Sequence, residues 1–394
     1  MSRRRWSLLL LLVGTSSASC LGGAADETVV SDQLEALPAV PNWTTHRAVT
    51  KVDVPSTRPA AGKFRIHAID VGTGLSILIQ GKDFTMLYDG GSGDDLAAGA
   101  NNRLMAYLAA SLGPSGPAAC TPNGDGWPRI DRPLIKIDHV FLSHPHQDHD
   151  SLLPDVLRCY DVREVWDSGD NNNRQGYQDF LAAAVARPGV LYHNAGGHLA
   201  GEVVTVASQP ITLPAGTTSF AEGDVITLGS HAKATILHVD GRVTSDENLN
   251  SIVVRVQLGT TSLLLAGDEE AGDRSPPTSP EGAVEQDLLA RHSAELAVDI
   301  LQVPHHGSST SSRLPFLQAT HPSVAVVSAG PKAYAGVVLP DQSVIDAISA
   351  LPNGPTIIRT DANDATIMQC APDRIGRDNA GAGGCDNWVI EVLH

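Results

Sequence analysis

The feature that most constrains the fold of this chain is the run His144-Pro145-His146-Gln147-Asp148-His149, which brings three imidazoles and one carboxylate into six residues. Residues 137–142 before it predict a buried strand and the residues after it predict a helix, so the run is expected to form a tight loop. Imidazole nitrogen and carboxylate oxygen are ligands of catalytic zinc, whereas structural zinc sites use mostly thiolates, and the chain has no CxxC pair. The run therefore predicts a metal site; the alternative is a solvated histidine-rich turn.

The run alone does not supply enough ligands for two metal ions. His144 and His146 are two residues apart in an extended segment and can point the same way. Asp148 and His149 are expected to turn toward a second position about 3.5–4 Å away, the usual separation in two-metal sites. Further ligands are therefore expected at the ends of other strands.

Two other apolar runs end in residues that can bind metal. Asp268 follows residues 263–266 and could bridge two ions, although an aspartate that caps the next turn would produce the same pattern. His305 and His306 follow residues 299–304. Adjacent histidines predict one ligand and one residue that supports a ligand or faces the substrate. We expect His305 to be the ligand and His306 to take the other of these two roles.

Strand-like and helical patterns alternate along most of the chain. Residues 20–63 are rich in Ala, Pro, Thr and Ser and predict an extended tether, with an edge strand as an option, so the folded domain is expected at residues 64–394. Two β-rich halves, each with helices, predict an α+β fold of two sheets packed face to face with helices outside. The predicted strands are residues 64–71, 75–79, 85–88, 137–142, 162–166, 203–205, 224–228, 233–238, 251–258, 262–266, 299–303 and 324–328, and the predicted helices are residues 102–112, 151–158, 177–186, 284–291 and 342–351.

The amino terminus has the pattern of an export signal. Residues 1–19 contain a basic, an apolar and a small-residue zone, and the apolar zone is too short to span a bilayer as a helix. Cys20 follows in a context that resembles a bacterial lipobox, so we expect either a lipoprotein anchored through Cys20 or a secreted protein after ordinary cleavage. Loss of the leader's three arginines would take the formal charge from −17 to about −20, which disfavours tight binding to duplex DNA.

Four further cysteines remain after Cys20. An even number in an exported chain favours two disulfides, and Cys120–Cys159 with Cys370–Cys385 is the most plausible of the three connectivities. The alternative is buried free thiols.

Taken together and in order, these segments resemble the metallo-β-lactamase superfamily, and within it the hydrolase domain of the ComEC type. The resemblance spans roughly residues 64–350. The matching segments are His67-Ala-Ile-Asp70-Val-Gly-Thr-Gly74, Tyr88-Asp89-Gly90-Gly91, His144 to His149, Asn250-Ser251, Ala266-Gly267-Asp268, Val303-Pro-His305-His306-Gly-Ser308 and Val327-Ser-Ala-Gly330.

The resemblance implies a four-layer αββα sandwich and a site of two divalent ions, zinc first, with manganese or iron as alternatives. The metal ligands it implies are His144, His146, Asp148, His149, Asp268 and His305, and Asp148, His306 and Asp89 would take part in catalysis. Asp89 would orient a ligand imidazole.

The chain departs from the family pattern at several positions. Thr73 and Leu75 stand where Gln and Asp are usual, and residues 334–340 lack the usual histidine, which puts one substrate contact in doubt. A third single histidine, found in many members, has only weak candidates here: His198, His193 and His238.

The predicted function is that of an exported metal-dependent hydrolase that cleaves phosphodiester bonds in a nucleic acid, a nucleotide or an envelope polymer with metal-activated hydroxide. The acidic charge favours a small or single-stranded substrate over duplex DNA. Ser308, Thr310 or Lys332 could contact its phosphate. The alternatives are a hydrolase of another ester, a thioester or a lactam, and a non-catalytic surface binding module.

Overall fold

A computed structural model describes residues 42–95, 102–120, 133–169, 173–241, 246–362, 375 and 386–393. The predicted export signal, Cys20 and the predicted pair Cys370–Cys385 lie outside these residues. Among the helices that are described, none combines the length and the apolar character needed to cross a bilayer.

The first sheet has nine strands and is parallel where it carries the histidine-rich run. From β4 to β7 neighbouring strands run parallel, so their carboxyl ends meet at one edge. In sheet order the strands are β1 (Trp43–Ala48), β18 (Asn387–Val392), β2 (Phe64–Ala68), β3 (Ile77–Gln80), β4 (Thr85–Tyr88), β5 (Lys136–Leu142), β6 (Asp161–Asp167), β7 (Leu191–Asn194) and β10 (Thr217–Ser219).

The second sheet has seven strands and changes from antiparallel to parallel pairing at β14. Its parallel part carries Asp268 and the pair His305 and His306 after consecutive strand ends. In order the strands are β11 (Val225–Gly229), β12 (Ala232–His238), β13 (Val253–Leu258), β14 (Thr261–Leu265), β15 (Ile300–Gln302), β16 (Val324–Val327) and β17 (Thr356–Arg359), and a separate hairpin consists of β8 (Val203–Val206) and β9 (Gln209–Thr212).

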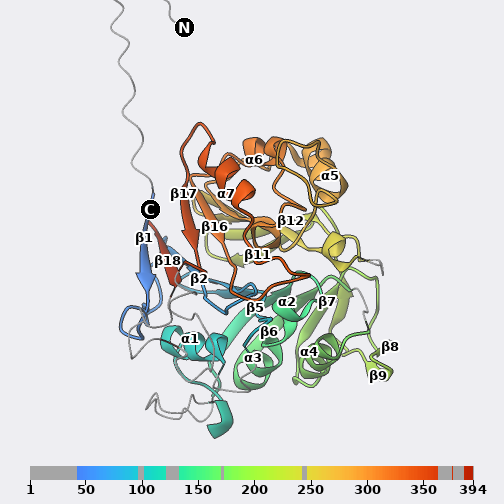
Figure 1. Ribbon diagram of the computed structural model, residues 1–394. Helices are drawn as coiled ribbons and strands as arrows, with labels where there is room; N and C mark the ends of the chain where they lie inside the picture. Colours follow the sequence, from blue (N-terminus) through green and yellow to red (C-terminus); the bar gives the residue numbers. More distant parts are fainter. Residues whose placement is uncertain are drawn as a thin grey trace, which may run out of the picture. The chain divides into compact units, whose positions relative to one another are not determined.

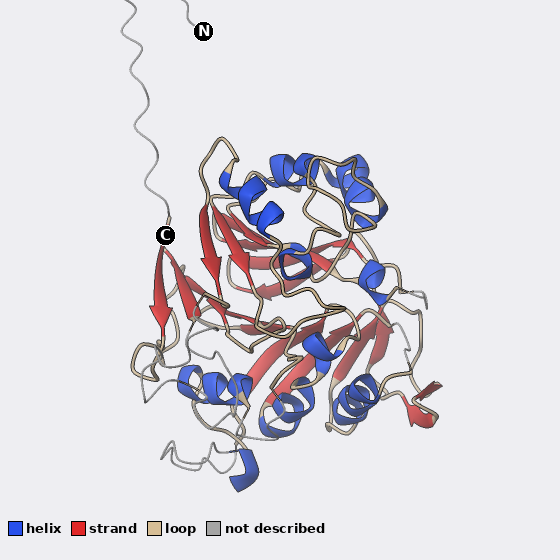
Figure 2. Ribbon diagram, in the orientation of Figure 1, coloured by secondary structure: helices blue, strands red, loops and turns tan. Residues whose placement is uncertain are grey.

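Three hydrophobic clusters define the four layers. One lies between the sheets, one joins the outer face of the first sheet to its helices, and one does the same for the second sheet. Figures 1 and 2 show the helices on the outer faces of the two sheets. The helices are α1 (Arg103–Ser111), α3 (Leu153–Cys159) and α4 (Gln175–Val185) on the first sheet, and α5 (Ala283–His292), α6 (Leu314–Thr320) and α7 (Gln342–Ser349) on the second. The predicted αββα sandwich is confirmed.

The folded part begins earlier than the sequence indicated. β1 lies within the segment predicted as a tether and pairs antiparallel with β18, from Trp43 opposite Val392 to Ala48 opposite Asn387. The optional edge strand therefore exists, and the boundary at residue 64 is wrong. A pairing partner more than 300 residues away leaves no periodic signal in the local sequence. The strands β7, β9, β10, β17 and β18 and the helix α6 were not predicted either.

The predicted bond between Cys120 and Cys159 is present, and both cysteines are buried against the helical layer of the first sheet. It ties the short helix η2 (Ala118–Cys120) to the end of α3. This bond holds the loop that follows α1 against the layer beneath the histidine-rich run.

Candidate metal centre

Asp89 and Ser143 fix the start of the histidine-rich run. Asp89 follows β4, is fully buried, and accepts hydrogen bonds from the backbone N–H of Ser143 at 2.7 Å and from its hydroxyl at 2.7 Å. Its Oδ2 also lies 2.8 Å from Nδ1 of His149. The contact expected between Asp89 and a ligand imidazole is therefore present, and it leaves Nε2 of His149 directed away from Asp89.

The turn that carries Asp148 and His149 rests on a glycine. The short helix α2 (Gln147–Asp150) packs its backbone so closely on Gly91 that a Cβ at Gly91 would lie 2.3 Å from the backbone nitrogen of His149. Only glycine permits this approach without a shift of the backbone. The Asp-Gly-Gly step after β4 thus sets the position of two candidate ligands.

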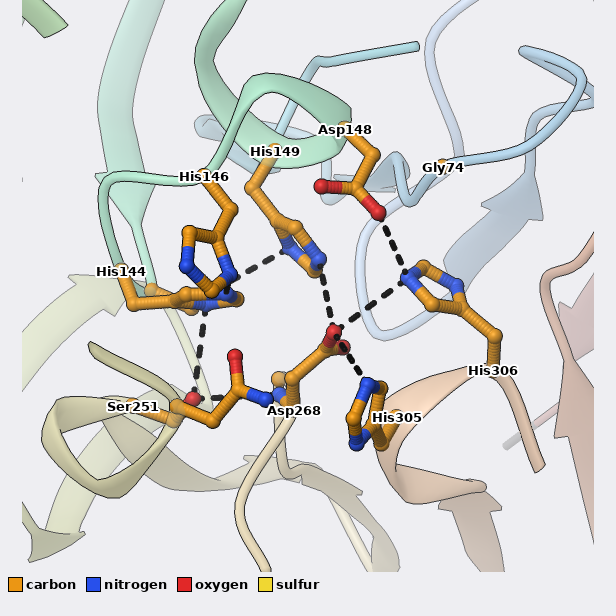
Figure 3. A network of polar contacts seen from close by, with 12 residues as sticks. Gly74, His144, His146, Asp148, His149, Ser251, Asp268, His305 and His306 are labelled. Atoms are coloured by element: carbon orange, nitrogen blue, oxygen red, sulfur yellow. Dashed lines mark hydrogen bonds and ion pairs between the residues drawn. The ribbon is translucent and has the colours of Figure 1, made fainter. Parts of the chain in front are cut away.

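Four buried residues form a compact group of donor atoms. One donor atom from each of Asp148, His149, Asp268 and His306 lies within 4.8 Å of the others. Oδ2 of Asp268 is 3.2 Å from Nε2 of His149 and 3.3 Å from Nε2 of His306, which lies 3.4 Å from Asp148. Figure 3 shows His149 and His306 directed at Asp268, with Asp148 next to His306. Residues from three strand ends, far apart in sequence, thus meet at one point.

The backbone around Asp268 is held by side chains. Ser251 Oγ accepts from the N–H of Asp268 at 3.1 Å, and Gln302 Oε1 accepts from the N–H of Gly267 at 2.9 Å. Gly267 has a φ of 58°, in the left-handed region that favours glycine. These contacts therefore fix the turn at Gly267 and Asp268, and the turn directs Asp268 into the donor group.

His144 and His146 form a second donor pair beside this group. Nε2 of His144 and Nδ1 of His146 are 2.9 Å apart, and Glu247 holds the other nitrogen of His146 at 3.1 Å. The His144 ring is 4.2 Å, between centroids, from that of His149. All six predicted ligands, Asp268 and His305 included, are thus brought to one region.

The surroundings of His305 and His306 differ from the predicted arrangement, in which His305 is the ligand. Nδ1 of His306 donates to the carbonyl of Ser328 at 2.7 Å, which leaves Nε2 to face the donor group. Nδ1 of His305 lies 2.9 Å from Glu270 and 2.8 Å from Thr310, and its Nε2 is 3.7 Å from Asp268. The geometry favours His306 as the ligand. Both residues have positive φ, and this turn, which the sequence does not reveal, decides which ring points inward.

Burial and neighbouring charges strongly shift the pKa values of the histidines in this region. Burial disfavours a charge on His149, but the carboxylates of Asp268 and Asp89 outweigh it and hold the pKa of His149 well above its usual value. Against the same burial, Asp268 and Asp148 raise the pKa of His306 to about 10. Burial and the neighbouring imidazoles lower the pKa of His144 well below its usual value, which keeps its ring neutral, the form that binds metal.

The donor group fits a divalent cation. Nε2 of His149, Nε2 of His306 and Oδ1 of Asp268 are buried without a hydrogen-bond partner. Buried polar atoms rarely remain unsatisfied, and such exceptions often mark the place of an ion. Carboxylate oxygens and imidazole nitrogens are also a donor set that zinc, manganese and iron accept.

The three candidates for an additional histidine lie elsewhere in the described structure. His198 contacts Glu202 at 3.2 Å, and His238 bonds the carbonyl of Leu249 at 2.9 Å. His193 stacks on Trp166 at a centroid distance of 3.9 Å. None of the three belongs to the donor group.

Several contacts of the site were not predicted. Ser251 and Ser328 were seen only as parts of strands, and Glu247 and Glu270 were not singled out, although all four contact predicted site residues or their backbone. Each lies within six residues of the start of β13 or of the end of β14 or β16, and this position is the signal that could have identified them. Of the predicted phosphate contacts, Ser308 accepts from Arg274 at 3.1 Å, Thr310 contacts His305, and Lys332 donates to the carbonyl of Gly93 at 2.5 Å.

Comparison with known sequences places the chain among proteins of one superfamily. Residues 69–330 match the metallo-beta-lactamase superfamily. The chain is 26% identical over 272 residues to the uncharacterized protein YcaI of Escherichia coli, which covers 69% of this chain and 26% of YcaI. It is 25% identical over 267 residues to recombination protein 2 of Haemophilus influenzae, 68% of this chain and 24% of that protein. The chain thus spans about a quarter of the length of these relatives.

A shorter match and two solved structures complete the comparison. Competence protein ComA of Neisseria gonorrhoeae is 33% identical over 121 residues, 30% of this chain and 15% of ComA. The metallo-β-lactamase fold protein YhfI of Bacillus subtilis has a TM-score of 0.39 at 10% identity, over 74% of this chain and 95% of YhfI. The diiron β-hydroxylase CmlA of Streptomyces venezuelae has a TM-score of 0.40 at 14% identity, over 77% and 54%. The chain belongs to the metallo-β-lactamase superfamily of metal-dependent hydrolases and resembles the ComEC type within it.

Proposed function

We propose that this protein is a phosphodiesterase that uses two divalent metal ions, zinc first, with manganese or iron as alternatives. The observation that carries the proposal is the buried group of Asp148, His149, Asp268 and His306, which lies beside the pair His144 and His146. In this group His149, Asp268 and His306 each have one buried donor atom without a hydrogen-bond partner. Such ions lower the pKa of water and polarise a phosphoryl oxygen.

The residues divide into two sets of donors around Asp268. Asp148, His149 and His306 would hold one ion, and His144 and His146 the other, with Asp268 shared by both. Nε2 of His144 and Nδ1 of His146 face each other at 2.9 Å, so either one carries a proton or both face a cation. The second arrangement agrees with the lowered pKa of His144, whose neutral ring keeps a lone pair available.

The surrounding residues orient the donors. Asp89, Glu247 and the Ser328 carbonyl each bond the nitrogen of a histidine that does not face the centre. Partners of this kind set the tautomer and the ring direction of ligating histidines. His305, with 21% of its side chain exposed and Nδ1 held by Glu270 and Thr310, would contact the substrate through Nε2.

Three cations near the donor set support a phosphate-containing substrate. Arg174 lies 3.6 Å from Glu247, which contacts His146. Arg274 donates to Ser308 in the loop that follows His306 and forms an ion pair with Asp341, and Lys332 contacts the backbone of Gly93. They would offset part of the repulsion between an acidic protein and an anionic substrate. The names of two relatives, recombination protein 2 and competence protein ComA, agree with a nucleic-acid substrate.

The experiment that tests this function combines metal analysis with three substrates. Purified protein, reconstituted with zinc, manganese or iron, is expected to bind about two equivalents and to cleave bis-p-nitrophenyl phosphate or single-stranded DNA. Asp268→Ala is expected to abolish turnover. Cleavage of nitrocefin alone would instead favour the lactam alternative, and folded protein with neither metal nor turnover would favour a binding module.

We also propose export through residues 1–19, with Cys20 as the lipid site. Labelled palmitate should enter the wild-type protein and not Cys20→Ser, and the variant should leave the membrane fraction. Equal amounts of unlabelled soluble protein from both would support ordinary cleavage and secretion instead.

A further inference from the structure

A second group of metal-binding side chains lies on three neighbouring strands, away from the centre described above. His139 on β5 and Glu164 on β6 are register partners. His193 on β7 pairs with Trp166, two residues beyond Glu164, so all three side chains project from the same face of the sheet. His139 precedes His144 by five residues of extended chain, which separates the two groups by roughly 16 Å.

Two imidazole nitrogens converge on one carboxylate oxygen. Nδ1 of His139 is 3.4 Å and Nε2 of His193 is 3.6 Å from Oε2 of Glu164. Both nitrogens are buried and neither makes a hydrogen bond. The His139 and His193 side chains are only 6% and 14% exposed, so water cannot freely satisfy these nitrogens. The three atoms are therefore turned toward a common point without a good partner there.

Other contacts hold His193 in this orientation. Its Nδ1 lies 2.6 Å from Oγ1 of Thr218 on β10, and its ring stacks on Trp166 with 19° between the planes. With the threonine oxygen as acceptor, the lone pair of Nε2 faces Glu164. A hydrogen bond on the far nitrogen and a packed ring are the support that ligating histidines usually have.

An ion could reach this group from solvent. A cavity of about 350 Å³ is lined by His139 and Glu164 together with Arg163, Leu191 and the ion pair of Lys136 with Asp138. The nearby imidazoles of His139 and His193 lower the pKa of Glu164 to about 2, so the carboxylate is ionised at neutral pH. Glu164 and His139 thus line this cavity, and His193 contacts the same carboxylate beside it.

We propose that His139, Glu164 and His193 form an additional binding site for one transition-metal ion, Zn²⁺ or another ion of similar preference such as Co²⁺, Ni²⁺ or Cu²⁺. Two imidazoles and one carboxylate are a known donor set for such ions. The site is independent of the centre around Asp268, and the proposal does not rest on the proposed phosphodiesterase activity.

Counting bound zinc in matched pairs of full-length variants tests the proposal. Each protein is dialysed against buffered Zn²⁺, and metal is measured by mass spectrometry. Wild type is expected to hold one equivalent more than Glu164→Gln, and Asp268→Ala one more than the double variant Asp268→Ala/Glu164→Gln. Because each pair differs only at Glu164, failure of the main centre does not obscure the result. Loss of a contact that supports a ligand typically weakens metal binding about 10–100-fold. His139→Ala removes a ligand itself, so it should weaken zinc binding at this site by at least as much.

The matched control is His292→Ala. His292 pairs with Glu222 at 2.8 Å, an ordinary imidazole–carboxylate contact without a converging second imidazole, so its loss should leave the metal count unchanged. In the Asp268→Ala background, bound Cu²⁺ should quench the fluorescence of Trp166. Its magnetic resonance spectrum should show coupling to two imidazole nitrogens, and adding His193→Ala should reduce this coupling to one nitrogen. Equal zinc counts in both Glu164 pairs, with no copper signal that depends on His193, would show that the group is only an ion-pair cluster.

Discussion

At the scale of single residues, the hydrogen-bond partner of Nδ1 distinguishes the roles of two adjacent histidines. His305 and His306 are adjacent and chemically identical, yet a backbone carbonyl holds one ring and a carboxylate with a hydroxyl holds the other. The first arrangement turns Nε2 into the buried donor group, and the second leaves the ring partly exposed. Ligand identity in this loop therefore follows from hydrogen bonding and not from residue type.

This difference predicts opposite effects on metal content. His306→Ala should weaken metal binding by about 10–100-fold or more, because the loss of a ligand should cost at least as much as the loss of a ligand's support. His305→Ala should retain both ions and lose mainly turnover. Metal analysis together with kcat and KM distinguishes the two variants. Retention of metal in His306→Ala with loss in His305→Ala would restore the assignment made from the sequence.

His67 is a buried histidine that lies outside the donor group and contributes to the packing of the fold. Its two nitrogens contact Tyr107 and Gln80, each at 2.9 Å, inside the first sheet and its helical layer. Burial lowers the pKa of His67 from 6.5 to about 3. The folded protein therefore keeps this ring neutral over a range in which the unfolded chain binds a proton.

The sign of this shift predicts acid sensitivity. As pH falls from 6.5 toward 3, proton uptake by the unfolded state alone should reduce the free energy of unfolding by up to about 1.4 kcal/mol per pH unit. His67→Asn should remove this contribution, whatever its effect at neutral pH. Urea unfolding at several pH values measures both slopes, and identical slopes would mean that His67 does not contribute.

At the scale of elements, the site depends on strand ends and the short turns after them. β4, β5, β14 and β15 each end at a candidate ligand or its support, and the turns are held by Ser143, Gln302 and close glycine contacts. The disulfide between Cys120 and Cys159 fastens the layer beneath. Rigid strands with short turns hold donor atoms more firmly than long loops do.

Gly91 allows this dependence to be tested without removing a ligand. Gly91→Ala would place a Cβ 2.3 Å from the backbone nitrogen of His149 and 2.4 Å from the carbonyl carbon of Asp148, so α2 must shift. We expect metal content and turnover to fall sharply while the circular dichroism spectrum stays close to that of wild type. Full metal content in this variant would show that α2 can move without harm to the centre.

At the scale of the whole molecule, net charge opposes the proposed substrate. The full chain carries a formal charge of −17, and the two ions proposed at the centre would add only a local positive charge. Repulsion of this kind acts over a length that falls as salt rises. By this argument the proposed centre should attract one phosphate group more readily than an extended duplex.

We therefore expect kcat/KM for a small phosphodiester or a short single strand to exceed that for duplex DNA. Added salt should help the long substrate more than the short one, because it screens the repulsion. The comparison requires both substrates at low and moderate ionic strength with constant metal. Tight duplex binding that weakens with salt would contradict it and indicate a basic surface that outweighs the net charge.

Local patterns in the sequence were sufficient for much of the fold and the site. The strand β4 was predicted with the observed ends, and β5, α1 and α5 within a residue or so. The donors His144 to His149 and Asp268 were found because each follows an apolar run. Alternation along a strand and ligand chemistry are properties of neighbouring residues, so they are visible in one dimension.

The sequence by itself determined the residue types that can bind metal, the strands that precede them and the layered architecture, since these depend on side-chain chemistry and on periods of a few residues. Only the tertiary structure decided that His306 faces the donor group, that β1 closes onto β18, and that His193 joins His139 and Glu164. Those outcomes depend on backbone dihedrals in a tight turn and on pairing between strands distant in the chain, and neither leaves a local pattern.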